Sequence, residues 1–183
     1  FGALPIQRIS KEDAAYIMRK AFDNGITYFD TARFYTDSEE KIGYALSDIR
    51  DKVIIATKTA ATNVTDFWKD LETSLGLLKT DYVDLYQFHN PSFCPKPGDN
   101  SGVYDAMLEA KEKGMIRHIG LTNHRHHIAK EAIECVKKGD VKVNENATVT
   151  LDGKSLTYSE NIYIMLNKPA GLISSTDDNR EKT

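Results

Sequence analysis

The 183-residue sequence lacks the marks of several classes of protein. Its only cysteines, Cys94 and Cys135, are too few for a disulfide scaffold and fit a reducing compartment, so a cytoplasmic location is expected. No apolar run approaches the roughly 18 to 20 residues of a membrane span, and no signal-peptide pattern opens the chain. Neither a membrane span nor secretion is therefore predicted. The sequence starts at Phe1 rather than Met, and we expect it to lack its natural start.

The sequence also has no large excess of either positive or negative charge. The chain has 24 Lys plus Arg and 27 Asp plus Glu, which gives a net charge of -3. Such a balance predicts no nucleic-acid or membrane partner from bulk electrostatics. With 40% hydrophobic and 28% charged residues, the composition is that of a globular chain.

Residues 1–134 alternate short apolar runs with helical patterns, which indicates β/α units. Strands are predicted over residues 26–29, 53–57, 82–88 and 116–122. The helix expected to begin after Ser10 carries its apolar face on Ala14, Ile17, Met18, Ala21 and Phe22. A doubly wound sheet and a barrel would both explain this parallel alternation.

The pattern changes after Lys138. Apolar and polar residues alternate over short stretches, Asp152-Gly153 is a turn signal, and residues 162–166 form an apolar run. No long helix is predicted here. The segment from Gly139 onward is therefore expected to be a small β-rich unit.

Four titratable residues fall at or just after predicted strand ends: Asp30, Tyr35, Lys58 and His89. The carboxyl ends of parallel strands form the edge where active sites are built. Taken singly, each has a plain structural explanation, such as a capping Asp, a solvated side chain or a His bonded to the backbone. Together they could transfer a proton to a carbonyl oxygen. No set of metal ligands is predicted.

The residue types suit that chemistry. A tyrosine with an ordinary pKa of about 10 is a weak acid unless a nearby cation stabilises its phenolate. Lys58 could supply the cation for Tyr35, and Asp30 could orient the ammonium group. His89 could donate a hydrogen bond to the substrate oxygen.

The same residues carry a family resemblance. The segments concerned are GITYFDTARFY at 25–35 with SEEKIG at 38–43, VIIATK at 53–58, DYVDLYQFH at 81–89 and GMIRHIGLTNH at 114–124. In that order and spacing they resemble the signatures of the aldo-keto reductases, over residues 1 to about 132. The resemblance implies a (β/α)8 barrel that reduces a small aldehyde or ketone with NADPH.

The resemblance also implies roles for individual residues. Tyr35 would be the general acid, Lys58 would tune its pKa, Asp30 would pair with Lys58, and His89 would orient the carbonyl. By the same resemblance, three residues would contact the cofactor: Asp30, Thr122 and Asn123. Thr122 and Asn123 occupy the positions that bind the nicotinamide carboxamide in the family.

By the family pattern, residues 1–3 would be the end of barrel strand one, and four further strands would end at Asp30, Lys58, His89 and Thr122. Strands six to eight, which hold most of the NADP(H) in the family, would be absent. The predicted fold is thus an incomplete TIM-type (β/α) barrel of about five strands out of eight, followed by a small β-rich fragment. An open barrel edge predicts self-association.

The tail has a resemblance of its own. Residues 132–144 resemble the end of an S4-type RNA-binding module, and residues 163–177 resemble the start of the catalytic domain of small-subunit-type rRNA pseudouridine synthases. That family's catalytic Arg-Leu-Asp motif does not occur here, and Asp177 and Asp178 read as solvated acids. Residues 135–183 carry seven basic and seven acidic side chains, which predicts weak RNA binding.

Two units are therefore predicted, a partial reductase barrel over 1–134 and a pseudouridine-synthase-like fragment over 135–183. The alternatives to a reductase are an RNA-binding or pseudouridine-synthase fragment and a non-functional chimera. A rearranged gene, a frameshift remnant and an assembly error would each produce such a join.

Overall fold

The computed structural model describes residues 1–137, 149–151, 154–156 and 163–166. Predictions that fall elsewhere in the tail, including those on Asp177 and Asp178, lie outside the described residues. Within the described ranges, no helix is long and apolar enough to cross a bilayer.

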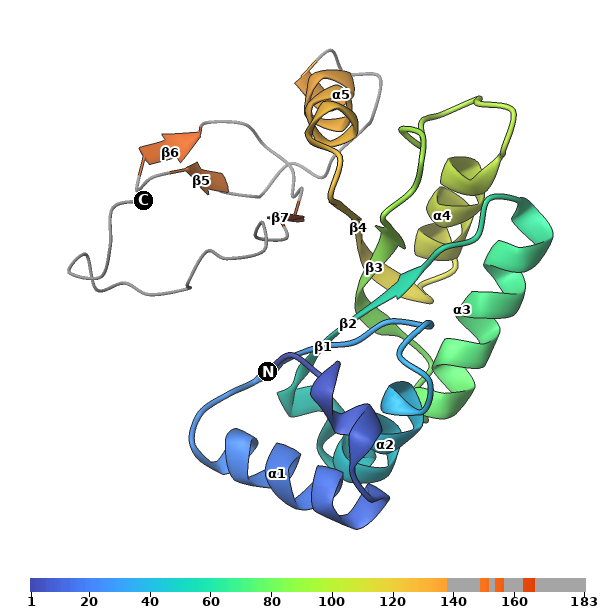
Figure 1. Cartoon of the computed structure of the whole chain (residues 1–183). Coiled ribbons are helices and arrows are strands. Elements are labelled where there is room, and N and C mark those ends of the chain that lie inside the picture. The colour runs from blue at the N-terminus through green and yellow to red at the C-terminus, as the bar shows by residue number, and fades with distance from the viewer. Residues whose placement is uncertain (138–148, 152–153, 157–162, 167–183) are drawn as a thin grey trace.

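A parallel sheet organises the chain (Figure 1). Its five strands run in the order β1-β2-β3-β4-β7. They are β1 (Tyr28–Asp30), β2 (Ile54–Thr59), β3 (Val83–His89), β4 (Ile116–Asn123) and β7 (Tyr163–Leu166). The prediction of a parallel α/β architecture is confirmed, and β2, β3 and β4 lie within two residues of their predicted bounds.

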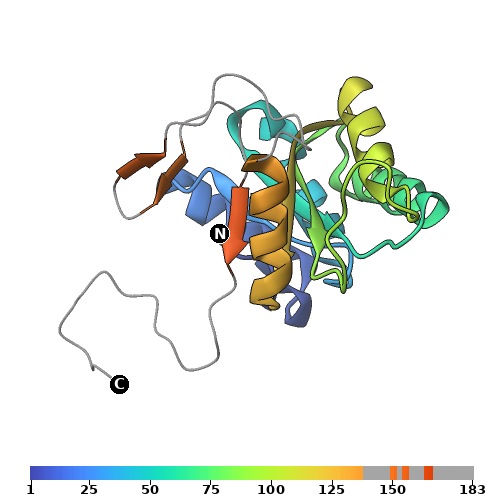
Figure 2. The same cartoon turned by 90° about the horizontal axis from the view of Figure 1, so that it is seen from above.

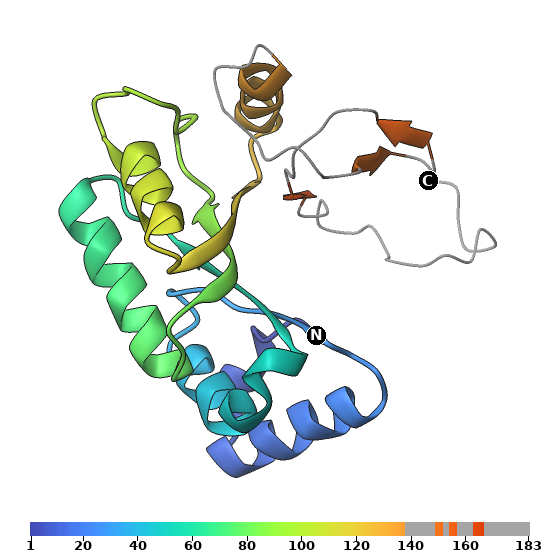
Figure 3. The same ribbon diagram turned by 180° about the vertical axis from the view of Figure 1, so that it is seen from behind.

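The helices alternate with these strands. They are α1 (Lys11–Asp23), α2 (Ser38–Leu46), α3 (Val64–Leu78), α4 (Val103–Glu112) and α5 (His126–Lys137), with short 3₁₀ turns η1 (Pro5–Arg8) and η2 (Ser47–Lys52). Helices α3 and α4 cover one face of the sheet (Figures 1 and 3), whereas α5 packs against β4 at the end of that strand (Figure 2).

Local sequence sets the bounds of several of these elements. Ser10 caps α1 by accepting a hydrogen bond from the Asp13 N–H at 3.0 Å, and Asn63 caps α3 in the same way through the Asp66 N–H at 2.9 Å. Helix α3 ends at Leu78, and the capping residue Lys79 adopts a left-handed conformation with φ of 55°. Only part of the predicted apolar face of α1 is buried: Ile17 is 41% exposed, because α1 packs on α2 along a narrower stripe.

The ends of the chain join the sheet in two ways. The sequence predicts residues 162–166 as part of a β-rich unit, and in the structure β7 pairs in parallel with β4, from Gly120 opposite Tyr163 to Asn123 opposite Leu166. Residues 1–3 lie beside β1 as expected, yet they form only an isolated bridge between Gly2 and Asp30. A short apolar run fits either kind of sheet, so its pairing is not set by local sequence.

A separate two-stranded antiparallel sheet lies in the tail. It joins β5 (Val149–Leu151) to β6 (Lys154–Leu156), on either side of the Asp152-Gly153 turn signal. The rest of the segment predicted as a β-rich fragment lies outside the described residues.

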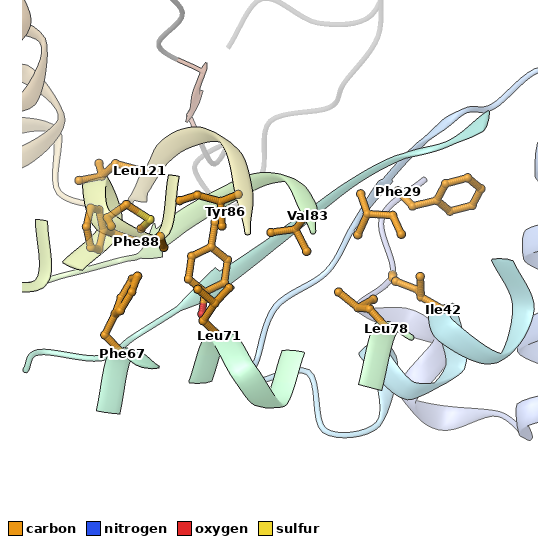
Figure 4. Packing of buried hydrophobic residues seen from close by; sticks show 14 of the residues in the cluster. Phe29, Ile42, Phe67, Leu71, Leu78, Val83, Tyr86, Phe88 and Leu121 are labelled. Atoms are coloured by element: carbon orange, nitrogen blue, oxygen red, sulfur yellow. The ribbon is translucent and has the colours of Figure 1, made fainter. Parts of the chain in front are cut away.

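The main apolar core lies between the sheet and its helices (Figure 4). The Phe67 ring of α3 meets the Tyr86 ring of β3 edge to face, with centroids 5.8 Å apart. Helices α2 and α3 approach closely at Gly43, where an added Cβ would lie 2.1 Å from the Leu77 carbonyl oxygen. This packing fixes helix α3 on the face of β3 that carries Tyr86, whereas Lys58 and Gln87, which pair in register, lie on the opposite face.

The amino ends of the strands are held by a buried carboxylate. Asp84, 7% exposed in its side chain, accepts hydrogen bonds from Arg50 at 2.7 Å, from Arg117 at 2.8 Å and from the Ile55 N–H at 2.9 Å. Both guanidinium groups also lie against the Tyr82 ring. Charge pairing thus stabilises the amino ends of the strands. In parallel β/α folds the active site is built at the opposite, carboxyl ends.

Candidate active site

The structure brings Asp30, Tyr35, Lys58 and His89 together at the carboxyl ends of the strands. Asp30 and His89 are the last residues of β1 and β3, and Tyr35 lies in the loop between β1 and α2. Lys58 lies inside β2, one residue before its end, and not after it as predicted. Three neighbouring strands and one loop thus supply the four side chains.

Lys58 and Asp30 form a buried ion pair. Lys58 Nζ lies 2.7 Å from Asp30 Oδ2 and donates a second hydrogen bond to the Thr31 carbonyl oxygen at 2.6 Å. Burial lowers the pKa of Lys58, and the Asp30 carboxylate opposes that shift. The other carboxylate oxygen, Asp30 Oδ1, is buried and has no hydrogen-bond partner among the described residues.

Tyr35 lies between the lysine and the histidine. Lys58 Nζ is 5.3 Å from the centre of the Tyr35 ring, and the His89 ring meets it edge to face at 5.9 Å. Burial raises the pKa of Tyr35, and the Asp30 charge adds to the rise. The phenol is therefore protonated at neutral pH, which is the state a proton donor needs. Stabilisation of its phenolate by Lys58 stays a prediction.

The loop that carries Tyr35 is tied to β2. The Arg33 N–H donates to the Lys58 carbonyl oxygen at 2.9 Å, and the Arg33 side chain pairs with the buried Glu39. Glu39 in turn accepts a hydrogen bond from Thr57 Oγ1 at 2.6 Å. These contacts were not predicted from the sequence, although Glu39 lies in the SEEKIG segment that carried the resemblance.

Backbone strain lies next to two of the four residues. Thr36, which follows Tyr35, has a φ of 38°, and Asn90, which follows His89, has a φ of 53°. Residues other than glycine avoid this left-handed region unless surrounding contacts impose it, and such positions gather at functional sites.

His89 is half-buried beside two aromatic rings. Besides Tyr35, the ring of Phe34 lies 6.1 Å away, and Phe34 itself is 69% exposed. Burial lowers the pKa of His89, and the Lys58 charge lowers it further. The imidazole is thus neutral at pH 7, with Nδ1 buried and unpartnered among the described residues.

Thr122 and Asn123 end β4. Thr122 pairs in register with His89, and its hydroxyl makes only a long contact of 3.4 Å with the Phe88 carbonyl oxygen. Asn123 is more fully engaged: its Nδ2 donates to the Pro91 carbonyl oxygen and its Oδ1 accepts from the Arg125 N–H, both at 2.7 Å. Of these two residues, Thr122 has the side chain with the weaker hydrogen bonding.

The site carries no metal-binding group in the described part of the chain, where no three His, Cys, Asp or Glu side chains come close enough to hold an ion. Its chemical resources are a protonated phenol, a buried ammonium–carboxylate pair and a neutral imidazole. This set can donate a proton to an oxygen atom and orient that oxygen.

Sequence comparison relates this chain to reductases. The model of the aldo/keto reductase family matches residues 1–173, which extends past the boundary predicted at residue 134. A methylglyoxal reductase of Salmonella typhimurium is 34% identical over 136 residues, which make up 70% of this chain and 49% of that protein. The chain thus spans about half the length of the curated relatives it matches.

Solved structures give the same relationship. The holo form of an aldo-keto reductase from Bacillus halodurans is similar with a TM-score of 0.65 and 29% identity, over 73% of this chain and 48% of that one. An aldo-keto reductase from Klebsiella pneumoniae in complex with NADPH has a TM-score of 0.63 and 26% identity, over 75% of this chain and 48% of that one.

Proposed function

This chain belongs to the aldo/keto reductase family, and we propose that it reduces a small aldehyde or ketone to an alcohol with NADP(H). The observation that carries the proposal is the gathering of Tyr35, Lys58 and His89 around one point at the carboxyl edge of the sheet. The cofactor, when bound, supplies the hydride that adds to the carbonyl carbon. The chain's own residues have to position the carbonyl and supply the proton.

Tyr35 is the proton donor in this proposal. As the carbonyl carbon gains a hydride, negative charge develops on the oxygen, and the Tyr35 O–H bond breaks as the alcohol O–H bond forms. The buried Lys58 ammonium group lies beside the ring and stabilises the phenolate left behind. Asp30 holds that ammonium group in place at 2.7 Å.

His89 orients the carbonyl. A neutral imidazole carries one N–H, which can donate to the same oxygen that receives the proton. The exposed Phe34 ring beside His89 offers an apolar surface to the rest of the substrate. We infer a small carbonyl compound on these grounds, and methylglyoxal, the substrate in the name of one relative, is the first probe.

The residues present fit the nicotinamide end of NADP(H). Asp30 Oδ1 is a buried acceptor that no described residue hydrogen-bonds, and a hydroxyl group of the cofactor could satisfy it. Thr122 has a hydroxyl group in only a long contact, whereas the Asn123 amide would have to exchange a backbone partner to bind a cofactor. We propose Asp30, Thr122 and Asn123 as cofactor contacts in that order of fit.

Titration with NADPH, followed by cofactor fluorescence, tests binding, and NADPH consumption with methylglyoxal tests turnover. We expect saturable binding, and the Tyr35→Phe variant should retain it while losing about 10²- to 10⁴-fold in turnover. Tyr44→Phe, on α2 and 47% exposed, is the matched control and should turn over like the parent chain. Equal turnover in the two variants would refute the role of Tyr35.

We also propose that the chain works in the cytoplasm and self-associates. Both cysteines are free, as a reducing compartment requires. Ile54 lies on the same face of β2 as Lys58 and is 46% exposed, so the sheet presents apolar surface there. Sedimentation at rising concentration should show dimers, and Ile54→Gln should weaken them.

The division into units at 1–134 and 135–183 stays a prediction. The family match to residue 173 and the pairing of β7 with β4 favour a reductase chain that continues past residue 134. No comparison supports the pseudouridine-synthase or RNA-binding alternative. A gel-shift with ribosomal RNA fragments at low and physiological salt tests it, and specific binding would revive it.

A further inference from the structure

A buried amide lies beside the candidate active site without a role in the reaction described above. Gln87 is 0% exposed, and neither Oε1 nor Nε2 of its carboxamide has a hydrogen-bond partner among the described residues. Burying an unpaired amide costs about 1–3 kcal/mol, so such a group needs a reason to be where it is.

Its place in the sheet puts Gln87 on the active-site face. Gln87 pairs in register with Lys58 of β2 and with Gly120 of β4, and paired residues of parallel strands point to the same face. Along β3, His89 is two residues further on, so it also shares this face, with the two Cα atoms about 6–7 Å apart. The helix-packed face of β3 carries Tyr86 and Phe88 instead.

Gly120 makes the room for this amide. A Cβ added at Gly120 would lie 2.8 Å from Gln87 Cγ and 3.2 Å from Gln87 Oε1. The side chain therefore lies over the β4 backbone, on the side away from Lys58. Lys58 already donates to Asp30 and to the Thr31 carbonyl oxygen, whereas His89 Nδ1 has no hydrogen-bond partner in the part of the chain that the structure describes.

We infer that Gln87 is a positioning residue: the two side chains make no direct hydrogen bond, and the Gln87 carboxamide N–H acts on His89 Nδ1 through one bound water, which leaves the ring proton on Nε2. In a neutral imidazole the partner of one nitrogen decides which nitrogen carries the proton. An Nδ1 that accepts a hydrogen bond requires an Nε2–H, which is the donor that a substrate oxygen needs. The inference rests on the proposed role of His89.

The charged and titratable groups that face His89 come from each neighbouring element. They are Lys58 on β2, Asp30 on β1, Tyr35 in the loop after β1, and His124 after β4. None of these four groups forms a hydrogen bond with His89 Nδ1, and the charge of Lys58 disfavours a second proton on the imidazole ring. The water held by Gln87 adds to this by donating to the Nδ1 lone pair, which only the neutral ring possesses.

The ¹⁵N chemical shifts of the imidazole nitrogens in the full 183-residue chain test the inference, with His89 assigned by its loss in His89→Asn. At neutral pH we expect Nε2–H in the parent chain. Gln87→Glu replaces the donor by an acceptor of nearly the same shape, so it should move the proton to Nδ1 and raise the pKa of His89. Gln87→Met should raise that pKa less and leave a mixture of tautomers.

Gly120→Ala gives an independent variant, because its Cβ would displace the Gln87 side chain while keeping the amide. It should resemble Gln87→Met. Ser74→Ala, which alters a buried polar group on α3 away from the site, should leave His89 unchanged. If Gln87→Glu does not fold, Gln87→Met and Gly120→Ala decide the matter.

Two results would overturn the inference. One is an Nδ1–H tautomer in the parent chain, and the other is the same tautomer and pKa of His89 in the parent and all folded variants. Because the readout needs no turnover, a chain that fails to reduce carbonyls can still show the Gln87 effect. The reverse outcome, turnover without a tautomer effect, would leave the proposed function standing.

Discussion

Lys58 Nζ and Asp30 Oδ2 lie 2.7 Å apart on neighbouring strands, with the Lys58 side chain only 3% exposed. Their charges are largely removed from water, so each depends on the other. Removing one partner of such a pair is costly because it leaves an uncompensated buried charge. The pair therefore supplies the buried charges of the site, and the loss of either partner is expected to destabilise the fold.

Lys58→Met should lower the free energy of unfolding by about 3–5 kcal/mol, because Asp30 would be left half-buried without its cation. Adding Asp30→Asn should recover part of that loss, since the double variant contains no buried charge. Urea unfolding of the two single variants and the double variant forms a double-mutant cycle. Strictly additive losses would show that the two side chains are not coupled.

Tyr35 should remain an acid across the neutral range. Its pKa is raised above the ordinary 10 by burial and by Asp30, so the phenol loses its proton only in strongly alkaline solution. Carbonyl reduction should then stay constant around neutrality and fall above the pKa of Tyr35. The difference in phenolate absorbance between the parent chain and Tyr35→Phe measures this pKa directly. Titration near neutrality would contradict the assignment.

The link from Thr57 to Glu39 should hold the Tyr35 loop. Thr57→Val leaves Glu39 Oε1 buried without its 2.6 Å partner, which should cost about 1–3 kcal/mol of stability. Amide exchange at Arg33, whose N–H bonds to the Lys58 carbonyl oxygen, should become faster. Thr73→Val, on the exposed face of α3, is the control, and equal exchange in both variants would show that the link does not hold the loop.

The chain should lose stability as the pH falls below about 6.5. The pKa of His89 is lowered in the folded state, so the unfolded chain binds a proton there first, and protonation favours unfolding. The loss begins near the ordinary pKa of 6.5 and is complete below the lowered folded pKa. His118, whose pKa is also lowered by burial, contributes in the same window.

Urea midpoints at about pH 7 and about pH 5 measure this slope. His89→Asn should flatten it, and the further change His118→Asn should flatten it again. A slope that is unchanged in the double variant would assign the acid sensitivity to other groups.

Much of the fold was predictable because it rests on local rules. The Ser10 cap, the apolar spacing of α3 and the β-branched run of β2 are each read from neighbouring residues. Pairing over long distances was not predictable in this way. The sequence predicts the run that forms β7 only as part of a β-rich tail, because four apolar residues fit several partners and only pairing with β4 selects one.

The candidate active site also has features that the sequence predicts and features that it does not. The sequence by itself determined that Asp30, Lys58 and His89 would meet, because strands that run in parallel bring their carboxyl ends to one edge. Only the tertiary structure decided how deeply each is buried, and burial sets the direction of the Lys58, Tyr35 and His89 pKa shifts. It also decided that Gln87 would lie over Gly120, since the two residues are far apart in the chain and meet only in the register of β3 with β4.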